Sequence, residues 1–462
     1  MHFWLSPSAP PNCTRFSGWW RRQERRSGQY FKAEPVRWTG ADTRVVGDDR
    51  FAGLFSGRSH CSTLKGAMSD LTRRVFLSSA AALTATRASG ANDRIRLGVI
   101  GTGGRATYLM RLLSKLPNTT LDAVCDVYKP HLHAAAQIAA PGAATYQDYR
   151  AMLDSQDIDG VVIGAPDHWH KQITLDAVSA GKDVYVEKPV SHSIDEGAEM
   201  VRVIEASGRV VQTGTQQRSW EHYRIGKQII DSGMLGPVHC VYTYWYQNYG
   251  ELSQNQVDPG QLDWKQWLGS APAQALTNEK FRYWRWYWNF GGGALTDLMT
   301  HWIDVVHWYL DDSTPVSALA SGKLYAYSWE CPDTITCVLD YPKNFTVTYH
   351  GNMTNRIDDG GIEFRGSKAT LKIDRSHLAV YSEASRDLPG TLLPEPEIIV
   401  RSQEDGTVAH LQNFLDCVRN RKTPNANIRL AHEAARASHL GNLSLKMGRR
   451  VNWNREEQRM DG

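Results

Sequence analysis

Short apolar segments alternate with helical segments through residues 92–215, and this alternation constrains the fold more than any other feature of the chain. Strands are predicted at 95–101, 121–126, 160–166, 183–189 and 210–214, and helices at 107–116, 131–139, 170–181 and 194–208. Strands that are separated by helices pair in parallel, and the helices cover both faces of the sheet. The pattern therefore predicts an α/β domain built on a doubly wound parallel sheet.

A glycine-rich turn follows the first strand and leads directly into a helix. The turn consists of Gly101, Thr102, Gly103, Gly104 and Arg105. Glycines at this corner let backbone N–H groups approach a pyrophosphate, whose charge the helix N-terminus favours. The second strand ends in Asp126, close to the spacing expected for an acid that binds the adenosine ribose. These features predict a Rossmann domain that binds a dinucleotide.

Asp126 also bears on the choice of cofactor. Its carboxylate would accept hydrogen bonds from the ribose hydroxyls and repel a 2′-phosphate, so NAD is expected rather than NADP. Arg105 and Lys129 weaken that preference because both are cationic. The alternative for Asp126 is a surface acid that caps the next helix.

Two strand ends carry a resemblance to a known family. Glu187-Lys188-Pro189 ends one predicted strand, and Ala165-Pro166-Asp167-His168-Trp169-His170 ends the strand before it. With the glycine turn, these motifs resemble the glucose-fructose oxidoreductase, inositol dehydrogenase and rhizopine catabolism (Gfo/Idh/MocA) family over about residues 92–455. The resemblance implies that Lys188 reaches the nicotinamide ribose and the reacting hydroxyl. It also implies that Glu187, Pro166 and His170 line the cofactor site.

The same resemblance implies a second domain at 216–455, for substrate binding and oligomerisation. It would contain a large, mostly antiparallel open sheet and end in closing C-terminal helices. Segments rich in β-branched and aromatic residues agree with such a sheet, at 239–249, 333–341, 345–351, 361–374 and 377–383. The family's outer sheet face often contacts another subunit, so a homo-oligomer is expected.

The reacting centre is expected on a helix after Gly291–Gly293. Asp297 and His301 are four residues apart, and would share one face of that helix. By resemblance, Asp297 holds a substrate hydroxyl and His301 takes the hydroxyl proton as hydride leaves. The alternative for His301 is a satisfied histidine in an aromatic helix face. Met299 stands where many relatives have glycine, and is expected to narrow the pocket or bend the helix.

The segment 281–290 contains seven aromatic residues and two arginines. Aromatic faces stack on sugar rings and arginines bind hydroxyls or acids, so this segment, with Trp264 and Trp267, suggests a sugar platform. Core packing is the alternative for about half of these side chains. We therefore expect an NAD-dependent oxidoreductase that acts on a secondary alcohol of a sugar, glycoside or cyclitol. The alternatives are a redox-neutral, glycoside-cleaving enzyme that uses transient oxidation, and a binding protein that keeps NAD as a structural element.

Charge and cysteine spacing exclude other classes. The chain has 52 Lys and Arg and 49 Asp and Glu, of which residues 1–90 hold 14 and 6, leaving 38 basic and 43 acidic residues in the body. A slightly acidic body argues against a nucleic-acid surface. The seven cysteines form no CxxC pair, so no metal site is expected. Cys331 and Cys337 could form a disulfide in an oxidising compartment.

Residues 68–91 resemble an export signal of the twin-arginine type. Arg73-Arg74 precede an apolar stretch from Val75 to about Ala85, which is too short to span a membrane. Residues 1–67 are then an over-extended start or a disordered leader, and the product is expected in the periplasm. The alternative is that Arg73-Arg74 begin a short amphipathic helix, in which case the protein is cytoplasmic.

Overall fold

The computed structural model describes residues 94–461 apart from 251, 254 and 384–394. The expected leader (1–67) and export signal (68–91) lie outside the described residues. The described chain belongs to one compact unit that begins at residue 87. None of its helices is both long enough and apolar enough to cross a membrane.

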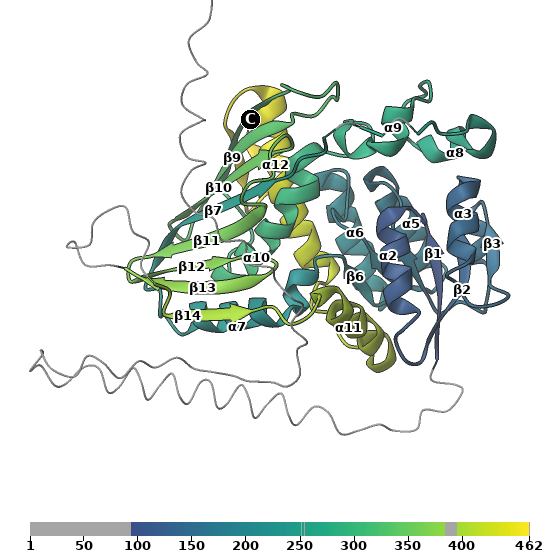
Figure 1. Cartoon of the computed structure of the whole chain (residues 1–462), viewed down its shortest axis with the longest axis horizontal. Coiled ribbons are helices and arrows are strands. Elements are labelled where there is room, and N and C mark those ends of the chain that lie inside the picture. Colours follow the sequence, from purple (N-terminus) through teal and green to yellow (C-terminus); the bar gives the residue numbers. More distant parts are fainter. Residues whose placement is uncertain (1–93, 251, 254, 384–394, 462) are drawn as a thin grey trace, which may run out of the picture. The chain divides into compact units, whose positions relative to one another are not determined.

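The first sheet contains six parallel strands in the order β3-β2-β1-β4-β5-β6 (Figure 1). The strands are β1 (Ile95–Ile100), β2 (Thr119–Cys125), β3 (Ala144–Tyr146), β4 (Gly160–Ile163), β5 (Asp183–Val186) and β6 (Val211–Thr213). The helices between them are α2 (Gly104–Leu113), α3 (Lys129–Ala136), α4 (Tyr149–Leu153), α5 (Asp167–Ser179) and α6 (Ile194–Ser207). Leu109 and Leu132 pack on one face of the sheet, and Ile173 and Met200 pack on the other. The predicted doubly wound parallel sheet is confirmed.

The observed strands are shorter than the predicted ones at their carboxyl ends. β4 stops at Ile163 and β5 at Val186, before Pro166 and Pro189. Proline has no N–H to donate to a sheet ladder, so the chain leaves the sheet before each of them. β3 and α4 were not among the predicted elements. They are only three and five residues long, and the strand is largely exposed, so they carry little periodic signal.

Gly101 brings the turn after β1 against the end of β4. Its φ is +75°, a conformation that side chains other than glycine rarely adopt. A Cβ atom there would lie 2.6 Å from the backbone nitrogen and Cα of Ala165. The turn therefore packs backbone against backbone, and only glycine fits at this position.

The second sheet has ten strands, in the order β14-β13-β12-β11-β7-β10-β9-β8-β15-β16. The strands are β7 (Val238–Tyr246), β8 (Ser317–Lys323), β9 (Thr334–Tyr341), β10 (Phe345–Asn352), β11 (Gly360–Gly366), β12 (Ala369–Ile373), β13 (His377–Ser382), β14 (Ile398–Arg401), β15 (Val451–Asn454) and β16 (Arg459–Asp461). β7 pairs in parallel with β10 and in antiparallel with β11, and the other neighbouring pairs given by register are antiparallel. The expected mostly antiparallel sheet is confirmed.

The single segment expected at 361–374 is a hairpin of β11 and β12. Ser367 and Lys368 form its turn, and their backbone N–H groups donate to the carbonyls of Pro237 and Leu235. These bonds tie the turn to the loop that precedes β7. β8, β14, β15 and β16 were not among the expected strands.

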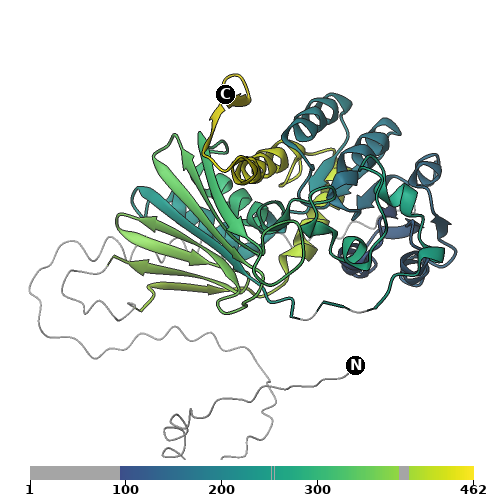
Figure 2. The ribbon, with the colours of Figure 1, turned by 90° about the horizontal axis from the view of Figure 1, so that it is seen from above.

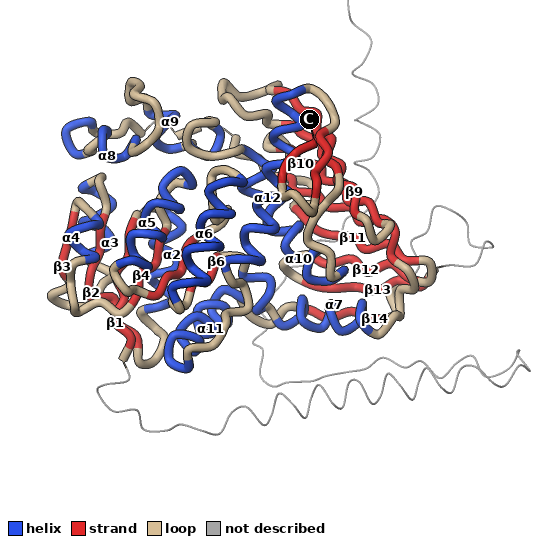
Figure 3. Tube along the Cα trace, turned by 180° about the vertical axis from the view of Figure 1, so that it is seen from behind, coloured by secondary structure: helices blue, strands red, loops and turns tan. Residues whose placement is uncertain are grey.

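Helices of the second half connect the two sheets. They are η2 (Gln216–Ser219), α7 (Glu221–Asp231), η3 (Pro259–Gln261), α8 (Trp264–Leu268), α9 (Asn278–Arg282), η4 (Trp284–Trp286), η5 (Leu295–Met299), α10 (Thr300–Leu310), α11 (Gly406–Asn420) and α12 (Ile428–Met447). α12 contacts α6 beside the first sheet and β8 in the second, so it lies between the sheets (Figures 1 and 2). α8 and α9 extend over the edge of the first sheet (Figure 3).

A buried ion pair anchors α10 to η2. The Nε atom of Arg218 lies 2.9 and 2.8 Å from the two carboxylate oxygens of Asp304, which is fully buried. Arg218 also donates to the backbone carbonyl of Asp304. Burial raises the pKa of Asp304, and the guanidinium opposes that rise. Because η2 follows β6 directly, this pair fixes α10 relative to the first sheet.

We predict that Asp304→Ala destabilises the protein by about 3–5 kcal/mol, because it leaves the Arg218 guanidinium buried without a partner. The measurement is urea unfolding followed by tryptophan fluorescence. The control is Glu457→Ala, which breaks the exposed pair with Arg459 and should cost no more than about 0.5 kcal/mol. Equal effects of the two substitutions would contradict this role for the buried pair.

Candidate active site

Two cavities meet at the carboxyl edge of the first sheet. The first, of about 290 Å³, is lined by the glycine turn and Asp126, and we call it the glycine-turn cavity. The second, of about 250 Å³, is lined by Lys188, Asp297 and His301, and we call it the lysine cavity. Both cavities are lined by Gly164, Ala165, Trp284 and Arg285. The two cavities are therefore adjacent parts of one cleft.

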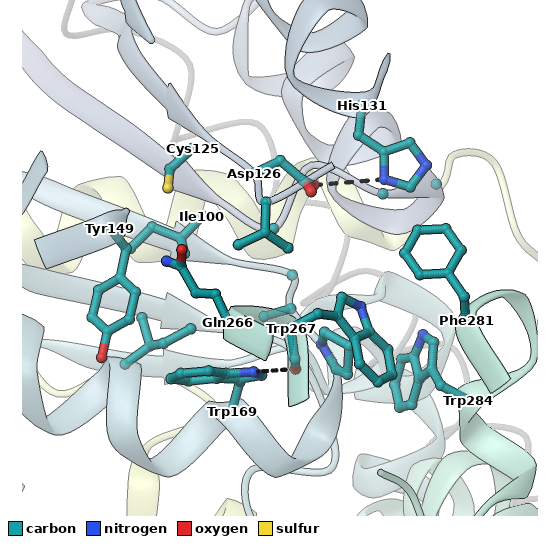
Figure 4. Close-up of a pocket in the computed structure, with 18 of the residues that line it drawn as sticks. Ile100, Cys125, Asp126, His131, Tyr149, Trp169, Gln266, Trp267, Phe281 and Trp284 are labelled. Atoms are coloured by element: carbon teal, nitrogen blue, oxygen red, sulfur yellow. Dashed lines mark hydrogen bonds and ion pairs between the residues drawn. The ribbon is translucent and has the colours of Figure 1, made fainter. Parts of the chain in front are cut away.

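The glycine-turn cavity places backbone donors beside an acid (Figure 4). Gly101, Gly103 and Gly104 line it, and α2 begins there with no side-chain cap on its N-terminal N–H groups. Asp126, only 8% exposed, accepts hydrogen bonds from the backbone N–H of Thr102 at 2.7 Å and of Tyr128 at 2.8 Å. Asp126 is therefore not a surface acid. Open N–H groups at a helix N-terminus are suited to a pyrophosphate.

Two residues predicted for this cavity have other positions. Thr102 is 2% exposed and does not line the cavity; its backbone N–H and hydroxyl instead donate to Asp126. Arg105 lines the lysine cavity, where its Nε atom lies 2.7 Å from Glu187. Arg105 does not line the cavity that contains Asp126, and its influence on the choice between NAD and NADP stays a prediction.

Aromatic side chains cover the opposite wall of the glycine-turn cavity. Trp169 and Trp267 face Asp126 across the cavity, and Trp169 Nε1 donates to the carbonyl of Trp267 at 2.8 Å (Figure 4). Trp264 stacks on Trp267 with ring centroids 4.6 Å apart. Trp267 thus belongs to this cavity, and Trp264 supports it from behind. Neither lines the lysine cavity.

Lys188 and Asp297 join the two halves of the chain in the lysine cavity. Lys188 follows β5, and its Nζ atom lies 2.6 Å from both the carboxylate and the backbone carbonyl of Asp297. Arg285 Nε lies 3.1 Å from the same carboxylate. Burial would raise the pKa of Asp297, but Lys188 and Arg285 outweigh it and hold the pKa below its ordinary value. Asp297 is therefore ionised at neutral pH.

His301 lies in the same cavity and is 5% exposed. Burial, followed by the charges of Lys188, Arg375 and Arg105, lowers the pKa of His301 well below 6.5. Its Nδ1 atom is fully enclosed without a hydrogen-bond partner among the described residues, so Nε2 is the nitrogen that is open to the cavity. His301 is therefore neutral near pH 7 and can accept a proton.

The helix that carries these residues is not a regular α-helix at its start. Residues Leu295–Met299 form a π-helical turn, and α10 begins at Thr300. Asp297 and His301 still line the same cavity. Met299 is fully buried in the hydrophobic core and lines neither cavity, so it does not narrow the pocket. It is the last residue of the π-helical turn, and the other expectation, that it bends the helix, stays a prediction.

The remaining predicted residues hold the strand ends together. Pro166 lines the glycine-turn cavity. His170 lines the lysine cavity, and its two ring nitrogens lie 2.7 Å from the carbonyl of Pro189 and 2.9 Å from that of Ala165. His170 therefore bridges the ends of β4 and β5. Glu187 lines the lysine cavity and is paired with Arg105.

The aromatic segment 281–290 divides between core and cleft. Trp286, Tyr287 and Phe290 are buried and line neither cavity, whereas Phe281 is buried but lines the glycine-turn cavity. Trp284 lines both cavities, and the guanidinium of Arg285 lies 4.2 Å from the centroid of its ring. The predicted aromatic platform is thus reduced to Trp284 in the lysine cavity. Cys331 and Cys337, proposed above as a disulfide, are both free thiols.

Asp167 is a site residue that the sequence analysis quoted but gave no role. It begins α5, lines the lysine cavity and is 2% exposed, and its carboxylate makes no hydrogen bond or ion pair within the described residues. Burial and the charge of Asp297 raise its pKa well above the ordinary value, against Arg285 and Lys188. Its position after the predicted strand was the only available signal. Among the described residues, no three His, Cys, Asp or Glu side chains are grouped to hold a metal ion.

Comparison with known families identifies both halves of the chain. The oxidoreductase family described as having an NAD-binding Rossmann fold matches residues 95–215, and the GFO/IDH/MocA C-terminal domain matches 223–372. The chain belongs to the Gfo/Idh/MocA family. It is therefore an oxidoreductase with an NAD-binding Rossmann domain, within which the glycine-turn cavity lies.

Sequence relatives and solved structures agree with this family. Inositol 2-dehydrogenase of Pseudomonas fluorescens is 34% identical over 227 residues, which cover 47% of this chain and 55% of the relative. An uncharacterised oxidoreductase of Bacillus subtilis is 23% identical over 304 residues, covering 64% and 78%. The sequence match thus spans about half the length of the Pseudomonas fluorescens inositol 2-dehydrogenase.

Two solved structures share the fold. Myo-inositol 2-dehydrogenase from Lactobacillus plantarum is 22% identical with a TM-score of 0.59, and the match covers 78% of this chain and 99% of that chain. Levoglucosan dehydrogenase in complex with NADH and levoglucosan is 16% identical with a TM-score of 0.61, with the same coverage.

The residues of this Gfo/Idh/MocA protein fit NAD. The turn at Gly101 packs its backbone against the backbone of Ala165. The N-terminus of α2 has backbone N–H groups without a side-chain cap, which are available for the pyrophosphate. Asp126 would hold the adenosine ribose at the far end of the glycine-turn cavity. Gly164 and Ala165 separate this cavity from the lysine cavity, so the nicotinamide end is expected beside Lys188.

We predict that Asp167→Asn stabilises the nucleotide-free protein, by an amount that increases with pH. The pKa of Asp167 is raised in the folded state. Its contribution to the free energy of unfolding is therefore fully present below the unfolded pKa of about 4 and is lost as pH rises through the folded pKa. Asparagine cannot ionise and avoids this loss, which is about 1.4 kcal/mol per unit of pKa shift.

The measurement for Asp167→Asn is the free energy of unfolding in urea at pH 5, 6.5 and 8. The matched control is Asp154→Asn at an exposed position, whose effect should not vary in this way. A stability difference that is constant with pH would contradict a raised pKa at Asp167.

Proposed function

We propose that this chain transfers a hydride between NAD and a secondary alcohol of a sugar or cyclitol. The observation that carries the proposal is the meeting of Lys188, Asp297 and His301 in one cavity that shares a wall with the dinucleotide site. The names of its relatives, inositol 2-dehydrogenase and levoglucosan dehydrogenase, support polyhydroxylated ring substrates.

Lys188 would bind the reacting oxygen. Its ammonium group has three donors, and two point to the carboxylate and carbonyl of Asp297. The third donor is available for a substrate hydroxyl. When hydride leaves the carbinol carbon, negative charge develops on that oxygen, and a fixed cation beside it stabilises the charge. Asp297 holds the ammonium group in place and offers a carboxylate to a neighbouring hydroxyl.

His301 would act as the base. A neutral imidazole with Nε2 open to the cavity can accept the hydroxyl proton while NAD, when bound, accepts the hydride. The alcohol thus loses one proton from oxygen and one hydride from carbon, and becomes a ketone. The charges of Lys188 and Arg375 disfavour the imidazolium. His301 therefore passes the proton on readily, which restores the base for the next turnover.

Trp284 would supply the surface on which the ring lies. It lines both cavities, so it lies beside the point where substrate and nicotinamide meet. An aromatic face favours the apolar face of a sugar ring. The neighbouring Arg285 guanidinium is already paired with Asp297, which fixes its position.

We predict that Lys188→Met and His301→Asn each lower kcat/KM by about 10²–10⁴-fold, because each removes a group that acts on the reacting oxygen. Binding of NAD by His301→Asn should change little, since His301 does not line the glycine-turn cavity. The measurement is NADH formation at 340 nm with inositols and hexoses. The controls are Lys115→Met and His239→Asn, both at exposed positions.

Two results would contradict the proposed function. One is near-normal NADH formation by Lys188→Met or His301→Asn. The other is release of the aglycone from a chromogenic glycoside without net NADH, which would instead establish the redox-neutral glycoside cleavage considered above.

We also propose that the protein is exported with NAD bound, as the twin-arginine pattern at 68–91 suggests. The periplasm supplies little free NAD, and the twin-arginine route carries folded proteins. Protein that is expressed from Met68 and recovered from the periplasm should release about one NAD(H) per chain on denaturation. Recovery only from the cytoplasm, without nucleotide, would overturn export with a bound cofactor.

A further inference from the structure

Arg375 lies beside the reacting centre, on the turn between β12 and β13. Its guanidinium lies 4.6 Å from the ring centroid of Trp245, and it also lines the lysine cavity. The Trp245 ring in turn stacks on His301, with centroids 5.8 Å apart and planes 21° from parallel. Arg375 and His301 thus contact the same indole.

Arg375 is the cation of the lysine cavity that has no acidic partner within the described residues. Arg105 pairs with Glu187, and Lys188 and Arg285 both pair with Asp297. Arg375 makes no ion pair or hydrogen bond there, and its guanidinium lies over the rings of Trp245 and Trp302. Its guanidinium therefore keeps all its donors available for a ligand.

The lysine cavity has more positive than negative charge. Its four cations face three acids, of which Glu187 and Asp297 have pKa values held low and Asp167 has a pKa raised well above its ordinary value. His301 is neutral. Bound NAD⁺ would add the positive charge of its nicotinamide ring. A substrate that carries one negative group would offset part of this excess, and a neutral sugar would not.

Arg375 is also accessible from outside. Together with Arg105 and Gln216 it lines an adjoining cavity of about 600 Å³. Two acids line that cavity, Glu404 and Asp405, and neither forms an ion pair with Arg375. Asp405 is engaged by the hydroxyl of Tyr108 and the backbone N–H of Thr407. An incoming anion can therefore reach the guanidinium without displacing a protein partner.

We propose that Arg375 binds a carboxylate of the substrate, so that the preferred substrates are sugar acids that present a secondary alcohol to Lys188 and His301. This inference rests on the proposed function, in which a secondary alcohol is oxidised, and adds that the same substrate carries an anionic group. A carboxylate matches the observation because a single planar guanidinium binds it through two parallel hydrogen bonds. A phosphate group is less well matched, since the nearest other cation, Arg105, is already held by Glu187.

The experiment compares matched pairs of substrates with the full chain and saturating NAD. The pairs are D-glucose with D-glucuronate and D-galactose with D-galacturonate, and D-glucose 6-phosphate tests a phosphate in place of the carboxylate. We expect kcat/KM for each acid to exceed that of its neutral partner by about 10- to 100-fold, as for other charge-assisted hydrogen bonds. Arg375→Gln should remove this preference through KM, so that within the variant each acid has no advantage over its neutral partner.

Arg365→Gln is the matched control. Arg365 lies on β11 of the same sheet with its guanidinium 5.0 Å from the centroid of the Tyr242 ring, and lines neither the lysine cavity nor the adjoining one. The Arg365→Gln variant should have unchanged kcat/KM for both the acid and the neutral sugar of each pair. Equal kcat/KM for acids and neutral sugars, or an equal loss for both in Arg375→Gln, would overturn the inference. A preference for the sugar phosphate would overturn the assignment to a carboxylate.

Calorimetric titration of the NADH-loaded protein separates this inference from the proposed function. D-glucuronate should bind at least about tenfold more tightly to the native protein than to Arg375→Gln, whereas D-glucose should not distinguish them. That result without any hydride transfer would uphold the carboxylate site and refute the proposed reaction. Equal binding of D-glucuronate to both proteins would refute the carboxylate site.

Discussion

The ion pair of Lys188 with Asp297 is the contact on which the site depends. Lys188 extends from the end of a strand in the first sheet, and Asp297 lies on the π-helical turn before α10. The two residues are 109 positions apart in the chain, yet their atoms approach to 2.6 Å. Each is largely shielded from water, so each requires the other to remain charged. The cavity between the domains therefore contains a cation of fixed position, which a reacting oxygen can use.

Much of the first domain could be predicted because its signals are local. Gly101 is required by a positive φ and a backbone contact, and Asp126 follows a strand at a recognisable distance. The pairing of Lys188 with Asp297 was not predicted, since it depends on how two domains pack. The π-helical turn was also missed, because Asp297 and His301 have the spacing of an ordinary helix and nothing in that spacing indicates an inserted residue.

The second domain could be predicted less well from local signals in the sequence. Its antiparallel sheet followed from a family resemblance, whereas composition alone located only some of its strands. The strands that were missed include β14 to β16, each three or four residues long. Asp167 and Arg375 were missed for a different reason. An acid and a cation without partners look ordinary in a sequence, and only the position of their neighbours shows that neither side chain forms an ion pair within the part of the chain that the structure describes.

The C-terminal helices have a consequence for how the chain is made. Leu411 and Phe414 of α11 complete the core on one face of the first sheet, and Ile428 and Ala431 of α12 complete the core on the other. A nascent chain that has emerged only as far as β6 thus lacks part of the core on each face of its nucleotide domain. The first domain to be synthesised is among the last to be finished, and the dinucleotide site reaches its final packing only when almost the whole polypeptide has left the ribosome.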